Sequence, residues 1–171
     1  IQDVVLSDRL TMGPVTERFE RAYAELNGSQ YAVAVNSGSS ANLLMVAAMS
    51  LRQGTGTVIV PAISWATSYA PFQQYGWKLK FVDINRKTLN YDMKALHEAF
   101  TGDELILAVN LLGSPNDFKS FPALGNQVLE DNCESMGATY NQIPTGNFGA
   151  MGSHSTYFSH HMCTIEGGLI T

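Results

Sequence analysis

Residues 31–51 read YAVAVNSGSSANLLMVAAMSL, and this stretch decides the predicted fold. Its first five residues form a short β-type run, NSGSS at 36–40 is a tight turn, and the remainder, rich in Ala, Leu and Met, predicts a helix through Leu51. A strand that passes through a turn directly into a helix is the building unit of an α/β fold.

The rest of the chain continues this alternation. After an amphipathic entry helix that ends at Asn27-Gly28, further strands are predicted at 57–60, 79–82, 105–111, 128–129 and 153–158, with helices at 64–75 and 92–100. The expected fold class is α/β, with a mostly parallel sheet and helices on both faces.

Two units are expected along the chain: an N-terminal arm and entry helix at 1–28, and an α/β domain at 29–171. Residues 167–171 read as a turn that enters one more strand. We therefore expect the α/β domain to be incomplete at its C-terminus, because a core strand needs a return connection.

Composition restricts the function. The 171 residues carry a net charge of −5 and lack the basic surface that attracts nucleic acid or an anionic membrane. The longest apolar run, 43–49, is far shorter than the roughly 20 residues of a membrane-spanning helix. Since the N-terminus has no signal-peptide pattern, we expect a cytoplasmic protein. Cys133 and Cys163 form neither a disulfide framework nor a zinc motif, so no metal site is expected.

Candidate ligand-binding residues follow the first two strands. Gly38, Ser39 and Ser40 open a helix, where backbone N–H groups and the helix dipole attract a phosphate; an ordinary serine cap is the alternative. Trp65 follows the second strand, where its ring either covers one face of a heteroaromatic cofactor or packs into the core.

The later strands deliver groups suited to proton chemistry. Glu130 and Asp131 end the fifth strand, where a carboxylate either holds a proton on a pyridine nitrogen or caps a turn. Ser155 belongs to the sixth strand, and His160 and His161 follow in the loop beyond it. Adjacent side chains in an extended segment point in opposite directions, so at most one histidine faces a site, where it suits general-base catalysis; a surface or core histidine is the alternative.

Together these motifs resemble the pyridoxal-phosphate-dependent nucleotide-sugar aminotransferase family over nearly the whole chain. The matching stretches are LTMGP at 10–14, NSGSSANL at 36–43, VIVPAISWAT at 58–67, FVDI at 81–84, EDNCE at 130–134, GNFG at 146–149, Ser155 and EGG at 166–168. The resemblance implies the large domain of an aspartate-aminotransferase-like enzyme of fold type I, with pyridoxal 5'-phosphate as cofactor. The residues that match its cofactor site are Gly38, Ser39, Ser40, Trp65, Asp131, Glu134 and Ser155.

One position departs from that family. Its aminotransferases carry, six residues before the Glu-Gly-Gly motif, a lysine that forms a Schiff base with the cofactor, and here that position is His160. An imidazole cannot form this bond, so non-covalent contacts alone would hold the cofactor. The run FSHHMCTIEGG at 158–168 resembles the branch in which histidine replaces the lysine, the 3-dehydratases of 4-keto-6-deoxy nucleotide sugars, and its GDP-linked members above all.

This branch implies a reaction and its partners. The amine form of the cofactor, pyridoxamine 5'-phosphate, condenses with the C4 ketone of the nucleotide sugar, and His160 removes a proton from the cofactor's methylene carbon as the C3 hydroxyl departs. Glutamate is the implied amino donor. The resemblance also implies a homodimer, and it places Glu134 near the cofactor's 3-hydroxyl or the departing sugar hydroxyl.

Two alternatives stay open. An iron–sulfur branch that acts on CDP-linked sugars also carries a His-His pair, and Cys133 matches a cysteine of that branch. Its further cluster cysteines would follow Thr171, and its loop ends differently from Thr164-Ile165-Glu166, which favours the cluster-free dehydratase. The second alternative is a cofactor-binding protein without catalysis, although a base retained at His160 argues against it.

Overall fold

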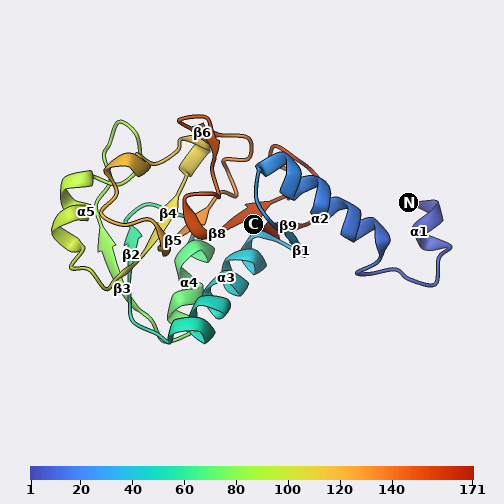
Figure 1. Cartoon of the computed structure of the whole chain (residues 1–171), viewed down its shortest axis with the longest axis horizontal. Coiled ribbons are helices and arrows are strands. Elements are labelled where there is room, and N and C mark those ends of the chain that lie inside the picture. The colour runs from blue at the N-terminus through green and yellow to red at the C-terminus, as the bar shows by residue number, and fades with distance from the viewer.

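The main sheet has seven strands in the computed structural model, which describes residues 1–171. They are β1 (Val33–Val35), β2 (Thr57–Pro61), β3 (Lys78–Val82), β4 (Leu105–Val109), β5 (Gly125–Asp131), β8 (Gly149–Ser155) and β9 (Gly168–Ile170). Their order across the sheet is β1-β9-β8-β5-β4-β2-β3, and the run from β8 to β3 is parallel throughout. Only β9 runs antiparallel to its neighbours, β1 and β8 (Figure 1). The predicted α/β class with a mostly parallel sheet is confirmed.

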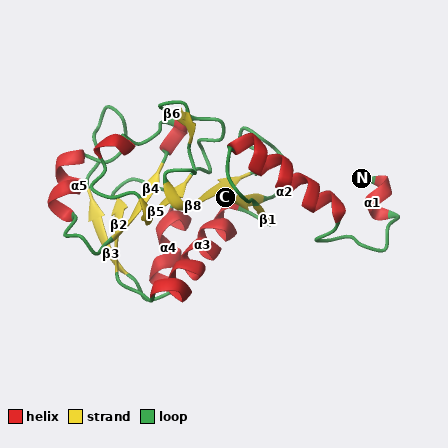
Figure 2. Ribbon diagram, in the orientation of Figure 1, coloured by secondary structure: helices red, strands yellow, loops and turns green.

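Helices cover both faces of this sheet, as Figure 2 shows. Helices α3 and α4 pack together on one face, and α5 covers the other beside β3. The helical elements are α1 (Gln2–Val5), α2 (Pro14–Asn27), α3 (Gly38–Gln53), α4 (Ala66–Gln74), α5 (Met93–Ala99) and the short 3-10 turns η1 (Leu111–Gly113) and η2 (Phe118–Ser120). A small antiparallel hairpin of β6 (Thr139–Tyr140) and β7 (Ile143–Pro144) lies between β5 and β8 in the sequence. None of the helices is long and apolar enough to cross a membrane.

Local sequence sets the helix boundaries. Pro14 stands in the first turn of α2, where its missing N–H costs nothing, and Gly28 ends that helix in the left-handed conformation. Asp92 caps α5 by accepting a hydrogen bond from Ala95 N (3.0 Å).

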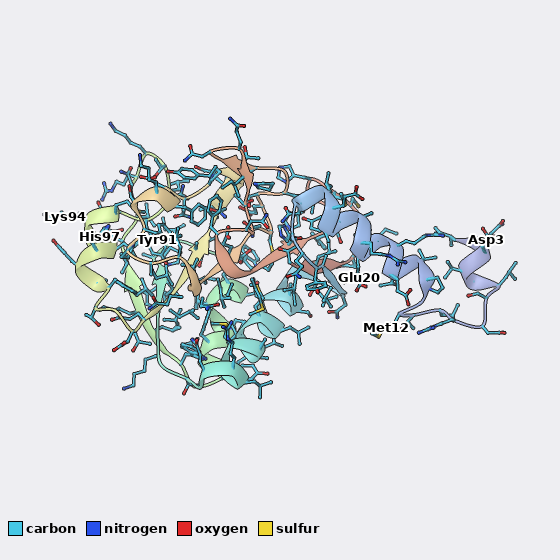
Figure 3. The ribbon with its side chains drawn as sticks, viewed as in Figure 1. Asp3, Met12, Glu20, Tyr91, Lys94 and His97 are labelled. Atoms are coloured by element: carbon cyan, nitrogen blue, oxygen red, sulfur yellow. The ribbon has the colours of Figure 1, made fainter.

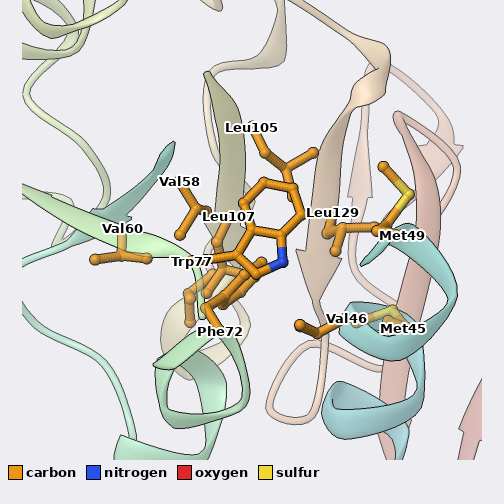
Figure 4. Packing of buried hydrophobic residues seen from close by; sticks show 11 residues of the cluster. Met45, Val46, Met49, Val58, Val60, Phe72, Trp77, Leu105, Leu107 and Leu129 are labelled. Carbon is orange, nitrogen blue, oxygen red and sulfur yellow. The ribbon is translucent and has the colours of Figure 1, made fainter. Parts of the chain in front are cut away.

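Alternating residues of the central strands divide the core between the two faces. On one face, Val58 and Leu107 pack with Met45 and Met49 of α3 and with Trp77, whose Nε1 donates to Ser50 Oγ (2.8 Å) (Figure 4). On the other face, Ile59, Ile106 and Val128 pack with Leu96 of α5 and with the aromatic residues Tyr91, Phe118 and Phe121. This period-two pattern is what a sheet buried on both faces requires.

The N-terminal segment stands apart from this core. Helix α1 has no buried residue, and the arm that carries Asp3 and Met12 projects away from the sheet (Figure 3). Helix α2 returns to the body, where Tyr23 and Ala24 pack against Ala32 and Leu169.

The structure differs from the sequence prediction around the sixth strand. Strand β8 occupies Gly149–Ser155, not 153–158, because Thr156 leaves the sheet and joins Thr164 at the base of a loop. Thr164 N donates to Thr156 O (2.9 Å), and the two hydroxyl oxygens are 2.6 Å apart. The loop between them carries His160.

His154 makes the stability of this fold sensitive to acid. Its ring is fully buried beside Tyr23, and burial lowers its pKa from 6.5 to about 4. Between these two pH values the unfolded chain binds a proton that the folded chain does not, so the free energy of unfolding should fall by about 3 kcal/mol from pH 7 to pH 4 through this residue. The His154→Gln variant should lack this part of the acid sensitivity. Urea denaturation of the unmodified protein and of His154→Gln at several pH values measures this difference. If the free energy of unfolding fell in parallel with pH in both proteins, the role of His154 would be contradicted.

Candidate functional site

A cavity of about 690 Å³ opens where β4, β5 and β8 end at their carboxyl edge, beside the first turns of α3 and α4. This is the place where open parallel sheets bind ligands. Its lining is largely polar and consists of Ser37, Gly38, Ser39, Asn42, Ile63, Ser64, Trp65, Thr67, Ser68, Val109, Asn110, Leu111, Asp131, Cys133, Glu134, Ser155, Tyr157, Ser159, His160 and Glu166.

The first turn of α3 faces the cavity with free backbone donors. Ser37 is the cap of this helix, since its Oγ accepts a hydrogen bond from Ser40 N (3.1 Å). The N–H groups of Gly38 and Ser39 have no partner within the helix and belong to the cavity lining. Ser40 lies outside that lining, with its Oγ 3.1 Å from Ser37 Oγ. The turn suits an anion at Gly38 and Ser39.

Glycine is required at two points beneath this turn. A Cβ on Gly38 would lie 2.6 Å from Cys133 Sγ and 2.7 Å from Ser155 Cβ. A Cβ on Gly168 would lie 2.5 Å from the carbonyl carbon of Ser37. The helix terminus therefore packs directly on β8 and β9, which brings Ser155 beneath the same turn.

Asp131 is the most buried of the three carboxylates that line the cavity. Its side chain is 5% exposed, and its Oδ2 accepts hydrogen bonds from Asn42 Nδ2 (2.8 Å) and Ser68 Oγ (2.6 Å). Cys133 N (3.1 Å) donates to Oδ1. No lysine or arginine pairs with this carboxylate, since the ion pairs of the structure are Lys80–Glu104 and Lys94–Glu98. A cationic ligand group fits such an unpaired buried charge.

Glu130 has a different task from its neighbour. Its carboxylate points to the opposite face of β5 and accepts hydrogen bonds from the backbone N–H groups of Gly146 (2.7 Å), Phe148 (2.7 Å) and Gly149 (2.9 Å). Burial raises its pKa. Glu130 holds the loop before β8 and lies outside the cavity lining.

His160 and His161 occupy different environments. His160 lines the cavity, with its ring 6.0 Å from the ring of Tyr157, and its side chain has no hydrogen-bond partner in the protein. His161 is exposed and outside the lining. A histidine without a protein partner at the mouth of a polar cavity is free to exchange a proton with a ligand.

Trp65 and Glu134 stand on the walls of the cavity. Trp65 is 75% exposed, so its ring is not part of the core, and the residue lines the cavity. Glu134 Oε2 accepts a hydrogen bond from Leu112 N (3.0 Å), which ties the carboxylate to the turn after β4. Leu112 adopts a positive φ of 52° in that turn.

The structure also brings in residues that the sequence did not single out. Asn42 and Ser68 both contact Asp131, and Asn110 lines the wall between β4 and β5, where its Nδ2 donates to Asn132 Oδ1 (2.7 Å). Asn42 carries a recognisable signal, since it lies one helical turn after Gly38 and so shares its face. No three His, Cys, Asp or Glu side chains gather in a way that could hold a metal ion.

Comparison with known proteins identifies relatives across the whole chain. The family described as DegT/DnrJ/EryC1/StrS aminotransferase matches residues 1–171. GDP-4-keto-6-deoxy-D-mannose 3-dehydratase of Escherichia coli O55:H7 is 50% identical over 181 residues, covering 99% of the chain and 46% of that relative. The protein of the same description from Yersinia pseudotuberculosis is 48% identical, with the same coverage of 99% and 46%. The chain thus spans slightly less than half the length of these curated relatives.

Solved structures agree with this placement. A histidine-to-asparagine variant of GDP-4-keto-6-deoxymannose-3-dehydratase, ColD, with bound GDP-perosamine superimposes with a TM-score of 0.88 at 48% identity, covering 94% of the chain and 44% of that chain. The same enzyme with a trapped PLP-glutamate geminal diamine gives 0.88 at 47% identity and the same coverage, 94% and 44%. A ColD variant with an adjacent serine and histidine replaced gives 0.92 at 46% identity, covering 99% and 47%. The predicted family and the fold of its large domain are confirmed.

Gly38→Ala tests the close packing beneath the first turn of α3. Because the new methyl group would overlap Cys133 Sγ and Ser155 Cβ, the free energy of unfolding should fall by about 1–3 kcal/mol. Gly56→Ala is the matched control, since its Cβ would meet only Trp77 at 3.8 Å and should change stability by less than about 0.5 kcal/mol. Urea denaturation measures the free energy of unfolding of both variants. Equal losses in the two variants would contradict the close packing around Gly38.

Proposed function

Because the chain belongs to the DegT/DnrJ/EryC1/StrS aminotransferase family, we propose that its protein is a 3-dehydratase that removes the C3 hydroxyl of a GDP-linked 4-keto-6-deoxy sugar in deoxysugar and lipopolysaccharide biosynthesis. One observation carries the proposal: His160 lines the cavity, and no lysine does. The 50% and 48% identity to two proteins described as GDP-4-keto-6-deoxy-D-mannose 3-dehydratase supports the choice of substrate.

The cavity fits pyridoxal 5'-phosphate and its amine form, pyridoxamine 5'-phosphate. The backbone N–H groups of Gly38 and Ser39 would bind the phosphate, with the Ser155 hydroxyl beneath them and Ser40 supporting the turn through Ser37. Trp65 would cover one face of the ring. The unpaired charge of Asp131 suits a protonated ring nitrogen.

His160 is the proposed general base. When bound, pyridoxamine 5'-phosphate supplies an amine for the C4 ketone and a ring that accepts the electrons of deprotonation. The imidazole of His160 would take the proton from the methylene carbon, since its ring nitrogens have no hydrogen-bond partner in the protein. The chain has two adjacent Ser-His pairs, Ser153-His154 and Ser159-His160. His154 is fully buried and outside the cavity lining, whereas Ser159 and His160 line the cavity, so His160 is the one placed to act as the base.

Glu134 is the proposed polar contact at the edge of the ring. Leu112 N occupies its Oε2, so its Oε1 is the oxygen left for the cofactor's 3-hydroxyl or for the sugar hydroxyl that departs. This hydrogen bond fixes the direction of the carboxylate before a ligand arrives.

We further propose glutamate as the amino donor and a homodimer as the working form. A PLP-glutamate adduct is present in a solved relative, which supports the donor. Exposed apolar residues of the N-terminal arm, together with Trp65 of the cavity and three residues next to lining residues in the sequence, support a second subunit: Ile1, Val5, Leu6, Leu10, Met12, Trp65, Leu112, Phe158 and Ile165. The acidic charge of −5 agrees with a cytoplasmic protein that binds neither nucleic acid nor membranes.

In this proposal residues 1–28 serve as an arm and entry helix, and residues 29–171 serve as the cofactor domain.

The reaction is tested with GDP-4-keto-6-deoxymannose, glutamate and pyridoxal 5'-phosphate. The purified protein should form the 3-deoxy ketone and release ammonia. His160→Asn should lower this rate by about 10²–10⁴-fold, because a positioned general base is lost, with pyridoxamine phosphate binding retained. Product analysis by mass spectrometry and fluorescence titration of the cofactor give the two readouts.

His161→Asn is the matched control and should retain the rate of the unmodified protein, since His161 lies outside the cavity. A greater loss in His161→Asn than in His160→Asn would overturn the assignment of the base. Formation of a 4-amino sugar alone would show an aminotransferase.

His160→Lys should attach the cofactor covalently, because a primary amine then occupies the position of the imidazole. After loading with pyridoxal phosphate and borohydride reduction, the variant should yield a pyridoxyl-labelled peptide spanning 158–168, and the unmodified protein should yield none. Its products should shift in part toward the 4-amino sugar that keeps the C3 oxygen. A label on this peptide in the unmodified protein would contradict non-covalent binding.

A further inference from the structure

Two neutral side chains from separate helices meet on one oxygen of Asp131. Asn42 of α3 donates to Oδ2 over 2.8 Å, and Ser68 of α4 donates to the same oxygen over 2.6 Å. Both residues are 2% exposed and both line the cavity. Hydrogen bonds from neutral donors at these distances stabilise the ionised form of a carboxylate.

The rest of the environment of Asp131 supplies no positive charge. Cys133 and Glu134 follow it on the same turn, and burial raises the pKa of the Cys133 thiol, so that group is neutral at pH 7. His154 lies on the neighbouring strand β8, and its pKa of about 4 leaves it neutral as well. On Oδ1, Cys133 N (3.1 Å) and Ser153 Oγ (3.4 Å) donate over longer distances. The two contacts on Oδ2 are therefore the shortest that the protein offers this charge.

We propose that Asn42 and Ser68 are positioning residues that together fix the Asp131 carboxylate at the cavity. The inference rests on the proposed function, in which the protonated ring nitrogen of the cofactor binds this carboxylate. With the carboxylate anchored from two helices, the ring nitrogen meets a fixed partner.

Neither side chain has another visible task. The Ser68 hydroxyl forms no other hydrogen bond, and neither does the Asn42 amide, whose Oδ1 is buried without a partner. A buried amide oxygen without a partner is costly, so the retained amide indicates that its contact with Asp131 offsets that cost. Substitution of either residue thus removes the contact with Asp131 and breaks no second hydrogen bond.

The test compares Ser68→Ala, Asn42→Leu and the conservative Ser68→Thr. Loss of a hydrogen bond to a charged group should weaken pyridoxamine phosphate binding by about 10- to 100-fold in the first two variants, whereas Ser68→Thr keeps the hydroxyl and should stay within about threefold. The ¹⁵N chemical shift of ring-labelled cofactor gives a second readout. It should report a protonated ring nitrogen in the unmodified protein and in Ser68→Thr, and a shift toward the unprotonated form in Ser68→Ala and Asn42→Leu.

A measurement without cofactor keeps the inference independent of catalysis. The carboxyl ¹³C chemical shift of Asp131 should change in Ser68→Ala and Asn42→Leu relative to the unmodified protein, because Oδ2 has lost one hydrogen-bond donor, and it should stay the same in Ser68→Thr. Ser50→Ala is the structural control: it removes the hydrogen bond from Trp77 and lowers stability, but it should leave the Asp131 ¹³C shift and the ring ¹⁵N shift unchanged.

The outcomes separate this inference from the proposed function. If the unmodified protein binds pyridoxamine phosphate with a protonated ring and the Ser68→Ala and Asn42→Leu variants match it in affinity, ¹⁵N shift and ¹³C shift, the positioning role is wrong and the proposed function stands. If the unmodified protein binds no pyridoxamine phosphate, the proposed function falls and the cofactor part of this inference falls with it. An unchanged ¹³C chemical shift would then overturn the remaining part, the role of the two residues in fixing the Asp131 carboxylate.

Discussion

Direct backbone packing at the first turn of α3 sets the geometry of the whole site. Gly168 of β9 lies against the backbone of Ser37, and Gly38 lies against the side chains of Ser155 and Cys133, so neither glycine leaves room for a Cβ. Four parts of the chain that are distant in sequence therefore share one small volume at the edge of the sheet. Since β9 directly follows the loop that carries His160, and Thr156 N bonds Gly167 O (2.9 Å), the packing also fixes the far end of that loop. A free helix terminus and a histidine thus face one cavity.

Two adjacent carboxylates at the end of β5 have different roles because of strand geometry: Glu130 stabilises the fold and Asp131 borders the cavity. Side chains alternate across a strand, so Glu130 and Asp131 must point to opposite faces. Glu130 is fully buried and bonds backbone N–H groups of the loop before β8, which makes it part of the scaffold. Asp131 is nearly as buried but borders the cavity, and its donors come from α3 and α4. Neither has a cationic partner, so neutral hydrogen bonds offset the burial of both.

The strand–turn–helix unit at 31–51 and the mostly parallel sheet could be predicted from the sequence, because apolar runs and turn residues are local signals. Sequence reasoning also placed Gly38, Trp65, Asp131 and His160 near one another, since the carboxyl ends of parallel strands share an edge. It could not find the contacts of Asp131 with Asn42 and Ser68, which join residues 89 and 63 positions apart. Nor could it foresee that Leu112 takes a left-handed backbone conformation to bind Glu134. In the run of four small residues at 37–40, only the structure shows that Ser37 is the cap and that Ser40 lies outside the cavity lining.

A histidine at position 160 changes what the remaining contacts must accomplish under the proposed function. A lysine would bond the cofactor and so tolerate weak contacts elsewhere, whereas an imidazole contributes nothing to attachment. Affinity then depends on the helix terminus at Gly38 and Ser39, on the face of Trp65 and on Asp131. Of these, Trp65 is exposed and contributes no fixed geometry, and the helix terminus binds only the phosphate end. Asp131 and Glu134, whose carboxylates are both held by hydrogen bonds, are therefore the contacts able to orient the ring relative to His160. A rigid carboxylate at Asp131 becomes a condition of catalysis as well as of binding.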